Sequence, residues 1–501
     1  MDVFPARADF AAAYGAGTAQ TVWTELPADL YTPVSVMLKL GQDRPFTALL
    51  ESIQGGAVRE RYSFISLEPD LVWRCKGQRA EICRNVGALP LAYEPDDKPT
   101  LTSLRALMAA SRMTLPAHLP PMAAGLIGYM GYDTIRLTEN IPDKNPDTLG
   151  IPDGLFMRPA ITLIFDTVKD LMTIVAAVYP KPGVSADNTF DEAERRIFSI
   201  IGSLDKAVPH ENSTVTPRFE APTSNIGRDG YHKMVEKAKE YILAGDIFQV
   251  VPSQRLRLPF TLSPFALYRA LRRLNPSPFL FHLNLEGFAI VGSSPEILVR
   301  LREGKVTIRP IAGTRPRGKT KAEDEALAVD LLADPKELAE HLMLLDLGRN
   351  DVGRVCKPGT VRVTERNIIE YYSHVMHLVS NVEGMISPPH DAMDALMAGF
   401  PAGTVSGAPK IRAMEIIDEL ETERRGFYGG AIGYLSANGD MDTCIALRTA
   451  LVKDGQVIAQ AGGGVVADSD PEAEYQESNN KARALIRAAE EAVRLFAGGN
   501  R

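Results

Sequence analysis

Alternating apolar and polar positions, interrupted by pairs of turn residues, predict several antiparallel hairpins in this chain. Strand-like runs flank Glu286-Gly287, Asn438-Gly439 and Asp454-Gly455, and each pair is typical of a two-residue hairpin turn. A further pair of apolar runs flanks Lys169-Asp170. Hairpins require antiparallel pairing, and no glycine-rich nucleotide-binding sequence opens a helix after a strand. We therefore expect an α+β fold in which helices flank large antiparallel β-sheets.

Apolar positions spaced by three or four residues predict helices between these strands. One such stripe runs through Tyr231, Val235, Ala238 and Ile242, and Gly245 marks its end. Further helices are expected over residues 101–112, 321–332, 335–347, 391–398, 410–420 and 471–496.

The chain divides at a stretch that has neither strand nor helix periodicity. Pro, Ser, Thr and Asn are frequent over residues 207–227, which is typical of a linker. We interpret residues 20–180 as an N-terminal region, 181–227 as the linker and 228–497 as a second region.

Composition and charge exclude several classes of partner. The 501 residues carry a formal net charge of −8 and no basic run with interleaved aromatic residues, which argues against a nucleic-acid partner. No uninterrupted apolar run reaches membrane-spanning length, so no membrane partner is expected. The four cysteines lack CxxC spacing, which favours a reducing, cytoplasmic compartment over a disulfide or zinc framework.

The helix expected over residues 335–347 carries a pair of carboxylates on one face. Glu337 and Glu340 are three residues apart, so they lie close together on the helix surface. We expect Leu338, Leu342 and Leu345 to form the buried stripe of this helix, which leaves both carboxylates on a neighbouring face.

A second pair lies at the start of the C-terminal helix. Asp470-Pro471 has the pattern of an N-cap followed by the first helical residue, which places Glu474 and Glu477 in the first two turns. Two such pairs on separate helices could converge on Mg²⁺, which prefers oxygen ligands. The alternative is that each pair belongs to a solvated helix face, with acidic residues that suit the helix dipole.

Other segments could bind an anion or hold a catalytic group. Gly462–Gly464 could expose backbone N–H groups to a ligand, and the loop over 400–410 could cradle an anion or form a plain turn. Arg448, expected in an alternating strand, could bind a carboxylate or form a surface ion pair. His377 lies in an apolar strand, where a histidine is either a core residue or a catalyst.

Six collinear blocks of the second region resemble the chorismate-binding enzymes. The blocks are GSSPE at 292–296, PIAGTR at 310–315, EHLM at 340–343 with DLGRND at 346–351, SHVMHL at 373–378, the loop 400–410 and the segment 462–481. In addition, LLES at 49–52 and NPSPF at 275–279 resemble the feedback site of the tryptophan-inhibited branch of this family. The resemblance then extends over residues 20–490.

The resemblance implies a Mg²⁺-dependent enzyme that aminates chorismate at C2 and then eliminates pyruvate to give anthranilate, the first step of tryptophan biosynthesis. It implies that Mg²⁺ is held by Glu340 and Glu477, with Glu337 and Glu474 in support. The implied catalytic residues are Glu296, as the acid that protonates the departing hydroxyl, and His377, which acts in pyruvate elimination. The implied substrate-binding residues are Gly313, Thr314, Thr404, Tyr428, Arg448, Gly462, Gly463, Gly464 and Lys481.

Two positions separate this chain from sibling enzymes. Relatives that use water as nucleophile have a Lys in place of Gln249, and Gln cannot act as a general base. Aminodeoxychorismate synthases usually have a Lys in place of Ala312, which here offers no nucleophile. The resemblance therefore favours direct amination at C2, with aminodeoxychorismate synthase as the second choice and a tryptophan-sensing or scaffold protein with an inactive pocket as the non-enzyme alternative.

Ammonia for such a reaction normally comes from glutamine. None of the cysteines has a nucleophile-elbow context, so the resemblance implies a separate glutamine amidotransferase subunit and a hetero-oligomer. It also implies tryptophan as a feedback inhibitor, although the same residues could form an ordinary strand and turn. The implied tryptophan-site residues are Leu50, Glu51, Ser52, Asn275, Pro278, Phe279 and Leu280, and Leu280 stands where a Met is commoner.

Overall fold

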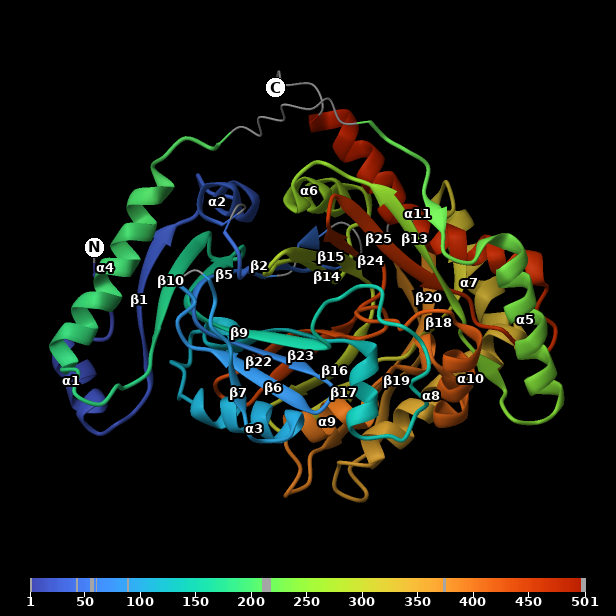
Figure 1. The fold of residues 1–501 in the computed structure, drawn as a ribbon, viewed down its shortest axis with the longest axis horizontal. Coiled ribbons are helices and arrows are strands. Elements are labelled where there is room, and N and C mark those ends of the chain that lie inside the picture. The colour runs from blue at the N-terminus through green and yellow to red at the C-terminus, as the bar shows by residue number, and fades with distance from the viewer. Residues whose placement is uncertain are drawn as a thin grey trace.

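The computed structural model describes residues 2–41, 44–54, 58–59, 61–87, 90–209, 218–372 and 375–496. Its main feature is a 21-stranded sheet in which every pairing between described strands is antiparallel (Figure 1). Helices lie around this sheet, so the expected α+β fold with large antiparallel sheets is confirmed. The helices are α1 (Arg7–Gly15), α2 (Pro33–Leu40), α3 (Thr100–Ala110), α4 (Ala186–Leu204), α5 (Gly227–Leu243), α6 (Pro264–Leu274), α7 (Lys321–Ala333), α8 (Pro335–Gly353), α9 (Ala392–Gly399), α10 (Lys410–Leu420) and α11 (Pro471–Phe496).

Strands from both halves of the chain contribute to the large sheet. The N-terminal strands are β1 (Gln20–Pro27), β2 (Thr47–Glu51), β5 (Tyr62–Lys76), β6 (Arg79–Cys83), β7 (Glu94–Asp96), β8 (Gly125–Met130), β9 (Gly154–Asp166) and β10 (Leu171–Val178). The remaining strands are β11 (Thr223–Ser224), β13 (Ser253–Pro259), β14 (Phe279–Asn284), β15 (Phe288–Ser294), β16 (Ile297–Arg302), β17 (Lys305–Ile308), β18 (Ile311–Pro316), β19 (Arg362–Tyr371), β20 (Val375–Met385), β22 (Ala431–Ser436), β23 (Met441–Ile445), β24 (Thr449–Lys453) and β25 (Gln456–Gly462). Two small pairs stand apart, β3 (Ile53–Gln54) with β4 (Val58–Arg59) and β12 (Gln249–Val250) with β21 (Gly407–Ala408). Short 3₁₀ turns are η1 (Pro121–Ala123), η2 (Tyr132–Leu137) and η3 (Gly403–Val405).

The hairpins expected from turn residues are all present. Glu286-Gly287 joins β14 to β15, Asn438-Gly439 joins β22 to β23, and Asp454-Gly455 joins β24 to β25. Lys169-Asp170 lies in the turn between β9 and β10. The glycines of the first three turns have φ of 77°, 101° and 71°, a region that a residue without Cβ enters at little cost. Local turn chemistry therefore predicted these connections.

The two expected regions share one sheet. β2 pairs with β14, so that Leu50 lies opposite Phe281, and β8 pairs with β22, so that Gly128 lies opposite Gly433. A Cβ at Gly128 would lie 1.9 Å from the Leu155 carbonyl oxygen, so only glycine permits the close approach of β8 and β9. Residues 20–180 and 228–497 are therefore continuous through the sheet.

The range 181–227, expected to be a linker, contains helix α4. Phe190, Ala193, Ile197 and Ile200 recur every three or four residues along α4 and are buried in the core that also includes β1 and β10. Figure 1 shows α4 and α1 on one side of this pair of strands. Because most residues around this stripe are polar, the composition of the segment did not indicate a helix. Residues 210–217 of the expected linker lie outside the described residues.

Helix α8 buries a different stripe from the one expected. Leu342 is 47% exposed, whereas His341, Leu345 and Val352 are buried. Gly348 extends this buried stripe, where an added Cβ would lie 3.3 Å from the Pro310 ring. The helix packs against β18 and β20 along positions 341, 345, 348 and 352, a spacing that the three leucines do not follow.

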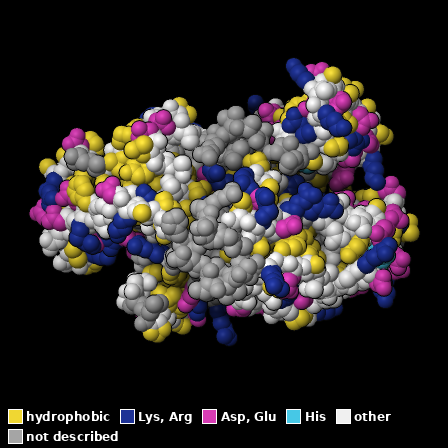
Figure 2. Space-filling view, turned by 90° about the horizontal axis from the view of Figure 1, so that it is seen from above, with side chains coloured by type: hydrophobic (Ala, Val, Ile, Leu, Met, Phe, Trp, Pro, Cys, Tyr) yellow, Lys and Arg dark blue, Asp and Glu magenta, His cyan; other side chains and the backbone are white. Residues whose placement is uncertain are grey.

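The helices close the ends and faces of the sheet. In Figure 1, α11 and α5 lie along the right side of the fold, α6 and α2 lie above the centre, and α3, α8, α9 and α10 lie below. The face seen in Figure 2 carries acidic, basic and apolar side chains interspersed with one another. Among the described helices, none combines the length and apolar character needed to cross a bilayer. All four cysteines are buried and free.

Candidate active site

His377 lies in β20 and is oriented by a bulge in the neighbouring strand. The register between β18 and β20 shifts between Ala312 and Thr314, which leaves Gly313 as the extra residue, with φ of 64°. Its carbonyl accepts a hydrogen bond from His377 Nδ1 at 3.0 Å, and Thr314 Oγ1 lies 3.1 Å from the same nitrogen. Because Nδ1 carries the proton, Nε2 keeps the lone pair that a base requires.

Burial keeps this imidazole neutral. The side chain is enclosed, and burial lowers the pKa of His377 to about 4, while the hydrogen bond to Gly313 opposes the shift. The positive charges of Arg448 and Lys481 lower the pKa further. Near neutral pH, His377 is therefore an uncharged base.

Glu296 lies in the short connection between β15 and β16, and its pKa is raised, whereas that of His377 is lowered. Its side chain is buried, and burial raises the pKa of Glu296 to about 8. Thr404 Oγ1 in η3 donates a hydrogen bond to its Oε1 at 3.4 Å, which lowers this pKa, as does the charge of Arg448. At neutral pH, Glu296 is therefore mainly protonated and can donate a proton.

Arg448 was expected in a strand, but it lies in the connection between β23 and β24. Its φ of 47° is left-handed, a conformation that costs about 1–2 kcal/mol for a residue with a Cβ. Within the described residues, its guanidinium makes no hydrogen bond or ion pair, although Glu296 lies nearby. Burial lowers the pKa of Arg448. An enclosed guanidinium of this kind is available to a ligand carboxylate.

Gly462 ends β25 and Gly463-Gly464 follow it; the three glycines pack closely against residues 249–252 and against α11. An added Cβ would lie 2.3 Å from the Pro252 carbonyl oxygen at Gly462, 2.6 Å from Glu474 Oε2 at Gly463 and 2.4 Å from Gln249 Nε2 at Gly464. All three distances are shorter than real Cβ contacts, but only Gly462 meets backbone, which cannot yield; Gly463 and Gly464 meet the ends of flexible side chains.

The amides of this segment, which we expect to bind an anion, are only partly free. Gly463 N–H donates to the Tyr231 hydroxyl at 3.1 Å, and Gly462 N–H interacts with the Tyr428 hydroxyl. Among the described residues, Gly464 N–H has no acceptor. Lys481 Nζ donates to the Gly462 carbonyl at 3.1 Å, so this lysine closes the segment from α11.

The carboxylate pair of α11 lies at its start, as expected. Asp470 caps the helix, because its Oδ1 accepts a hydrogen bond from Ala473 N at 2.9 Å. Glu474 Oε1 accepts from Ser469 Oγ at 2.7 Å, but Glu474 Oε2 is buried without a partner. Glu477 pairs with Lys481 at 2.7 Å. A buried carboxylate oxygen without a partner costs about 1–3 kcal/mol, which a bound cation would offset.

The α8 pair lies close to the α11 pair. Gln249 Nε2 donates to Glu340 Oε1 at 3.2 Å, and Gln249 is the side chain that touches Gly464. Arg315 Nη1 donates to Glu337 Oε1 at 3.2 Å. The hydrogen bond to Asp468 raises the pKa of Lys336, and the charges of Glu474 and Glu340 raise it further, so both helices contribute to one acidic region.

The electrostatics of this region fit a divalent cation. Burial raises the pKa of Glu337 and of Glu474, and the neighbouring Glu340 and Glu477, respectively, raise each further. Among the described residues, no three His, Cys, Asp or Glu side chains are grouped as ligands of one metal ion. This arrangement does not form a four-carboxylate cage, but it fits one inner carboxylate from each helix.

Arg425 is a residue that the sequence did not single out. Its guanidinium carbon lies over the rings of Tyr132 and Tyr428, at 4.7 and 5.4 Å from their centroids. It donates at 2.6 Å to the carbonyls of Val405 and Val251, and so ties the loop of Thr404 to the strand of Gln249. Its sequence context carries no signal of this role, because the partners come from distant segments.

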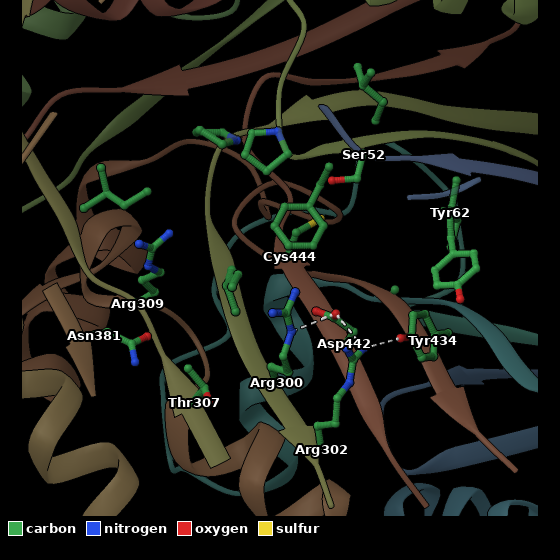
Figure 3. A pocket seen from close by; sticks show the side chains of 18 of the residues that line it. Ser52, Tyr62, Arg300, Arg302, Thr307, Arg309, Asn381, Tyr434, Asp442 and Cys444 are labelled. Carbon is green, nitrogen blue, oxygen red and sulfur yellow. Dashed lines mark hydrogen bonds and ion pairs between the residues drawn. The ribbon is translucent and has the colours of Figure 1, made fainter. Parts of the chain in front are cut away.

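A cavity of about 1280 Å³, which we call the central cavity, lies next to this site (Figure 3). On one side it is lined by the expected tryptophan-site residues Leu50, Glu51, Ser52, Pro278, Phe279 and Leu280. On the other side it is lined by residues that include Arg300, Thr307, Arg309, Tyr434, Asp442 and Cys444. In Figure 3, Arg300 and Arg302 both point toward Asp442.

Three of the expected tryptophan-site residues have other partners. The Glu51 carboxylate is held by Arg272 Nε at 2.5 Å and by the Tyr268 hydroxyl at 2.6 Å, both on α6. Leu280 is 1% exposed and belongs to the core beneath α6. Asn275 does not line the cavity, and its Nδ2 donates to Ser293 Oγ at 3.2 Å. Their side chains support the β2–β14 edge of the cavity.

The family model of the chorismate binding enzymes matches residues 68–487. The chain is 58% identical over 489 residues to anthranilate synthase component 1 of Cereibacter sphaeroides, with 97% of this chain and 98% of that protein covered. It is 47% identical over 470 residues to the Pseudomonas putida protein of the same name, with 93% and 94% covered.

Solved structures agree with this assignment. The crystal structure of anthranilate synthase component I from Streptococcus pneumoniae has a TM-score of 0.75 and 36% identity, covering 92% of this chain and 99% of that one. The menaquinone-specific isochorismate synthase from Escherichia coli, with a TM-score of 0.70 and 20% identity, shares the fold. The chain therefore belongs to the chorismate-binding enzymes and, within them, to the family of anthranilate synthase component 1.

Proposed function

We propose that this enzyme converts chorismate and ammonia to anthranilate and pyruvate, as the large subunit that opens tryptophan biosynthesis. The observation that carries the proposal is that one site holds a protonated Glu296 and a neutral His377, and that Arg448 lies near enough to lower the pKa of both. An acid with a raised pKa and a base with a lowered pKa in one site are what a two-step addition and elimination requires.

In this mechanism, Arg448 binds a carboxylate of chorismate and orients the ring. As ammonia adds at C2, the C4 hydroxyl takes a proton from Glu296 and leaves as water. His377 Nε2 then removes the C2 proton, the ether bond to the enolpyruvyl group breaks, and the ring becomes aromatic. The enolpyruvyl group takes up a proton and leaves as pyruvate.

Mg²⁺ fits the acidic region of this site. Glu340 and Glu477 would hold the ion, with Glu337 and Glu474 in support, and the unpartnered Oε2 of Glu474 favours a cation there. When bound, the ion supplies Lewis-acid stabilisation of negative charge on the substrate. The protein residues bind, orient and exchange protons as described above.

The nucleophile is ammonia, supplied by a separate glutamine amidotransferase subunit in a hetero-oligomer. Gln249 lies beside Glu340, where a side chain without a titratable nitrogen cannot deprotonate water. Ala312 is buried in β18 and offers no amine to the ring. Both observations support amination over the chemistries of the sibling enzymes.

Tryptophan is the feedback inhibitor, and its site is in the central cavity. Ser52 and Phe279 line the cavity opposite Arg300 and Asp442, so a hydroxyl group and an aromatic ring face charges of both signs. An amino acid offers a carboxylate, an ammonium group and an aromatic ring, which match these features.

The test mixes the purified chain with chorismate, Mg²⁺ and ammonium, and follows anthranilate fluorescence with and without tryptophan. Anthranilate formation that a chelator abolishes and tryptophan suppresses is the expected result. Chorismate consumed without anthranilate would indicate the aminodeoxychorismate reaction. No consumption, even with a glutamine amidotransferase subunit present, would contradict the enzyme proposal and favour a scaffold.

The pH profile is expected to follow both perturbed groups. Activity requires protonated Glu296 and neutral His377, whose pKa values are about 8 and about 4. The kcat/KM for chorismate should therefore fall above about pH 8, as Glu296 loses its proton, and below about pH 4, as His377 gains one. The profile is measured at a constant concentration of unprotonated ammonia.

A Thr404→Val variant tests whether Glu296 is the group that titrates in the alkaline limb of the pH profile. Thr404 donates to Glu296 and lowers its pKa, so loss of the hydroxyl should move this limb to higher pH and leave the acid limb unchanged. An alkaline limb at the same pH in the variant would argue against Glu296 as the acid.

A further inference from the structure

Tyr372 lies between the active site and the central cavity. It follows the last residue of β19, is buried, and lines the cavity. On the opposite side, its ring meets the His377 imidazole with centroids 5.3 Å apart and an angle of 69° between the planes. One side chain therefore separates the catalytic base from the cavity.

The Tyr372 hydroxyl begins a polar chain along the cavity wall. It donates to Glu370 Oε2 at 3.0 Å, and Glu370 Oε1 accepts from Arg309 Nη2 at 2.5 Å. Glu370 and Arg309 also line the central cavity, and Figure 3 shows Arg309 there. A ligand in the cavity that forms an ion pair or hydrogen bond with Arg309 or Glu370 would therefore alter the hydrogen bond between Tyr372 and Glu370.

On the active-site side, the same side chain is close to the substrate machinery. Burial lowers the pKa of Arg448, and the nearby Tyr372 and Glu296 oppose this shift. Burial and the nearby Glu370 raise the pKa of Tyr372, so it remains a phenol that donates a hydrogen bond.

The main chain of Tyr372 is held in place. Its N–H donates to the Val375 carbonyl at 2.8 Å, and its carbonyl accepts from Arg317 Nη1 at 2.6 Å. The hydrogen bonds of His377 Nδ1 to Gly313 and Thr314 hold one edge of the imidazole. The Tyr372 ring packs against the imidazole from the cavity side. Changes at the cavity would reach His377 through the side chain of Tyr372.

We propose that Tyr372 is a positioning residue that holds His377 for pyruvate elimination and, through Glu370 and Arg309, links this orientation to the content of the central cavity. This inference rests on the proposed function, because it concerns the second step of that reaction. It assigns to the cavity an effect on the elimination step as well as on overall activity.

The first test is Tyr372→Leu, which removes the ring from His377. With ammonium as nitrogen source, chorismate consumption should stay within about threefold of the parent while anthranilate formation falls by about 10–100-fold. The difference should be recovered as the aminated, non-aromatic intermediate, quantified by chromatography. Equal losses in both rates would show a merely structural role and overturn the positioning role.

The second test is Tyr372→Phe, which keeps the ring and removes only the hydroxyl. Inhibition is measured relative to the variant's own rate without tryptophan, so that a change in the basal rate does not enter the comparison. The tryptophan concentration for half inhibition should rise at least about fivefold, the lower range of allosteric coupling. Glu370→Gln, which removes the charge paired with Arg309, should shift inhibition in the same direction. Parent-like inhibition in both variants would overturn the link.

Tyr241→Phe is the matched control. Tyr241 lies on α5 and its hydroxyl donates to Glu419 of α10 at 2.7 Å, and Tyr241 lines neither the active site nor the central cavity. Its rates and inhibition should match the parent. A parent that makes anthranilate but ignores tryptophan would overturn the link alone, whereas a parent that makes no anthranilate would contradict the proposed function.

Discussion

A His377→Met variant is expected to consume chorismate at close to the parent rate but to form anthranilate about 10²–10⁴-fold more slowly. His377 is the neutral base of the second step, so its loss should leave amination intact and stop the removal of the C2 proton. The product should be the aminated, non-aromatic intermediate that still carries its pyruvyl group. Methionine has a similar length, and its sulfur can pack against the Tyr372 ring.

Separate quantification of chorismate and anthranilate over one time course measures this partition. His390→Met is the control, because His390 precedes α9, is partly exposed and lies outside the active site. It should convert chorismate to anthranilate as the parent does. If His377→Met stopped chorismate consumption as well, the histidine would act in the first step, contrary to the two-step mechanism.

A Glu340→Gln variant is expected to lose about 100-fold or more of its activity at a Mg²⁺ concentration that saturates the parent. Glutamine keeps the size and one oxygen but removes the charge that a divalent cation requires. The raised pKa of Glu337 has Glu340 as one of its causes, so the substitution should also relieve repulsion in the ion-free protein. Reduced activity should therefore be accompanied by unchanged or higher thermal stability without Mg²⁺.

A titration of anthranilate formation against Mg²⁺ measures the first effect, and thermal unfolding with and without Mg²⁺ measures the second. The parent should gain stability from Mg²⁺ by mass action, and the variant should gain less. Glu240→Gln is the control, since Glu240 pairs with Lys237 on the exposed side of α5. An unchanged Mg²⁺ requirement in Glu340→Gln would exclude Glu340 as a ligand.

Features that depend on neighbours in sequence were predicted well. The two-residue turns predicted the hairpins, because the left-handed φ of Gly287, Gly439 and Gly455 is a property of the local backbone. The cap Asp470-Pro471 similarly predicted the start of α11. The motif blocks, read as a resemblance, predicted a family membership that the comparisons confirm.

Features that depend on long-range packing were predicted less well. α4 was missed because its apolar stripe lies among polar residues, and Leu342 was placed on the wrong face of α8 because the sheet contacts decide which face is buried. Arg448 was placed in a strand, although the connection between β23 and β24 bends it into a left-handed conformation.

The sequence by itself therefore determined the antiparallel hairpins, the principal helices and the candidate chemical groups, because these follow from local backbone preferences and from side-chain identity. Only the tertiary structure decided which groups are enclosed together. Burial and proximity set the opposite pKa shifts of Glu296 and His377, and they place Tyr372 between the base and the central cavity. Such environments arise from segments distant along the chain, and no local pattern encodes them.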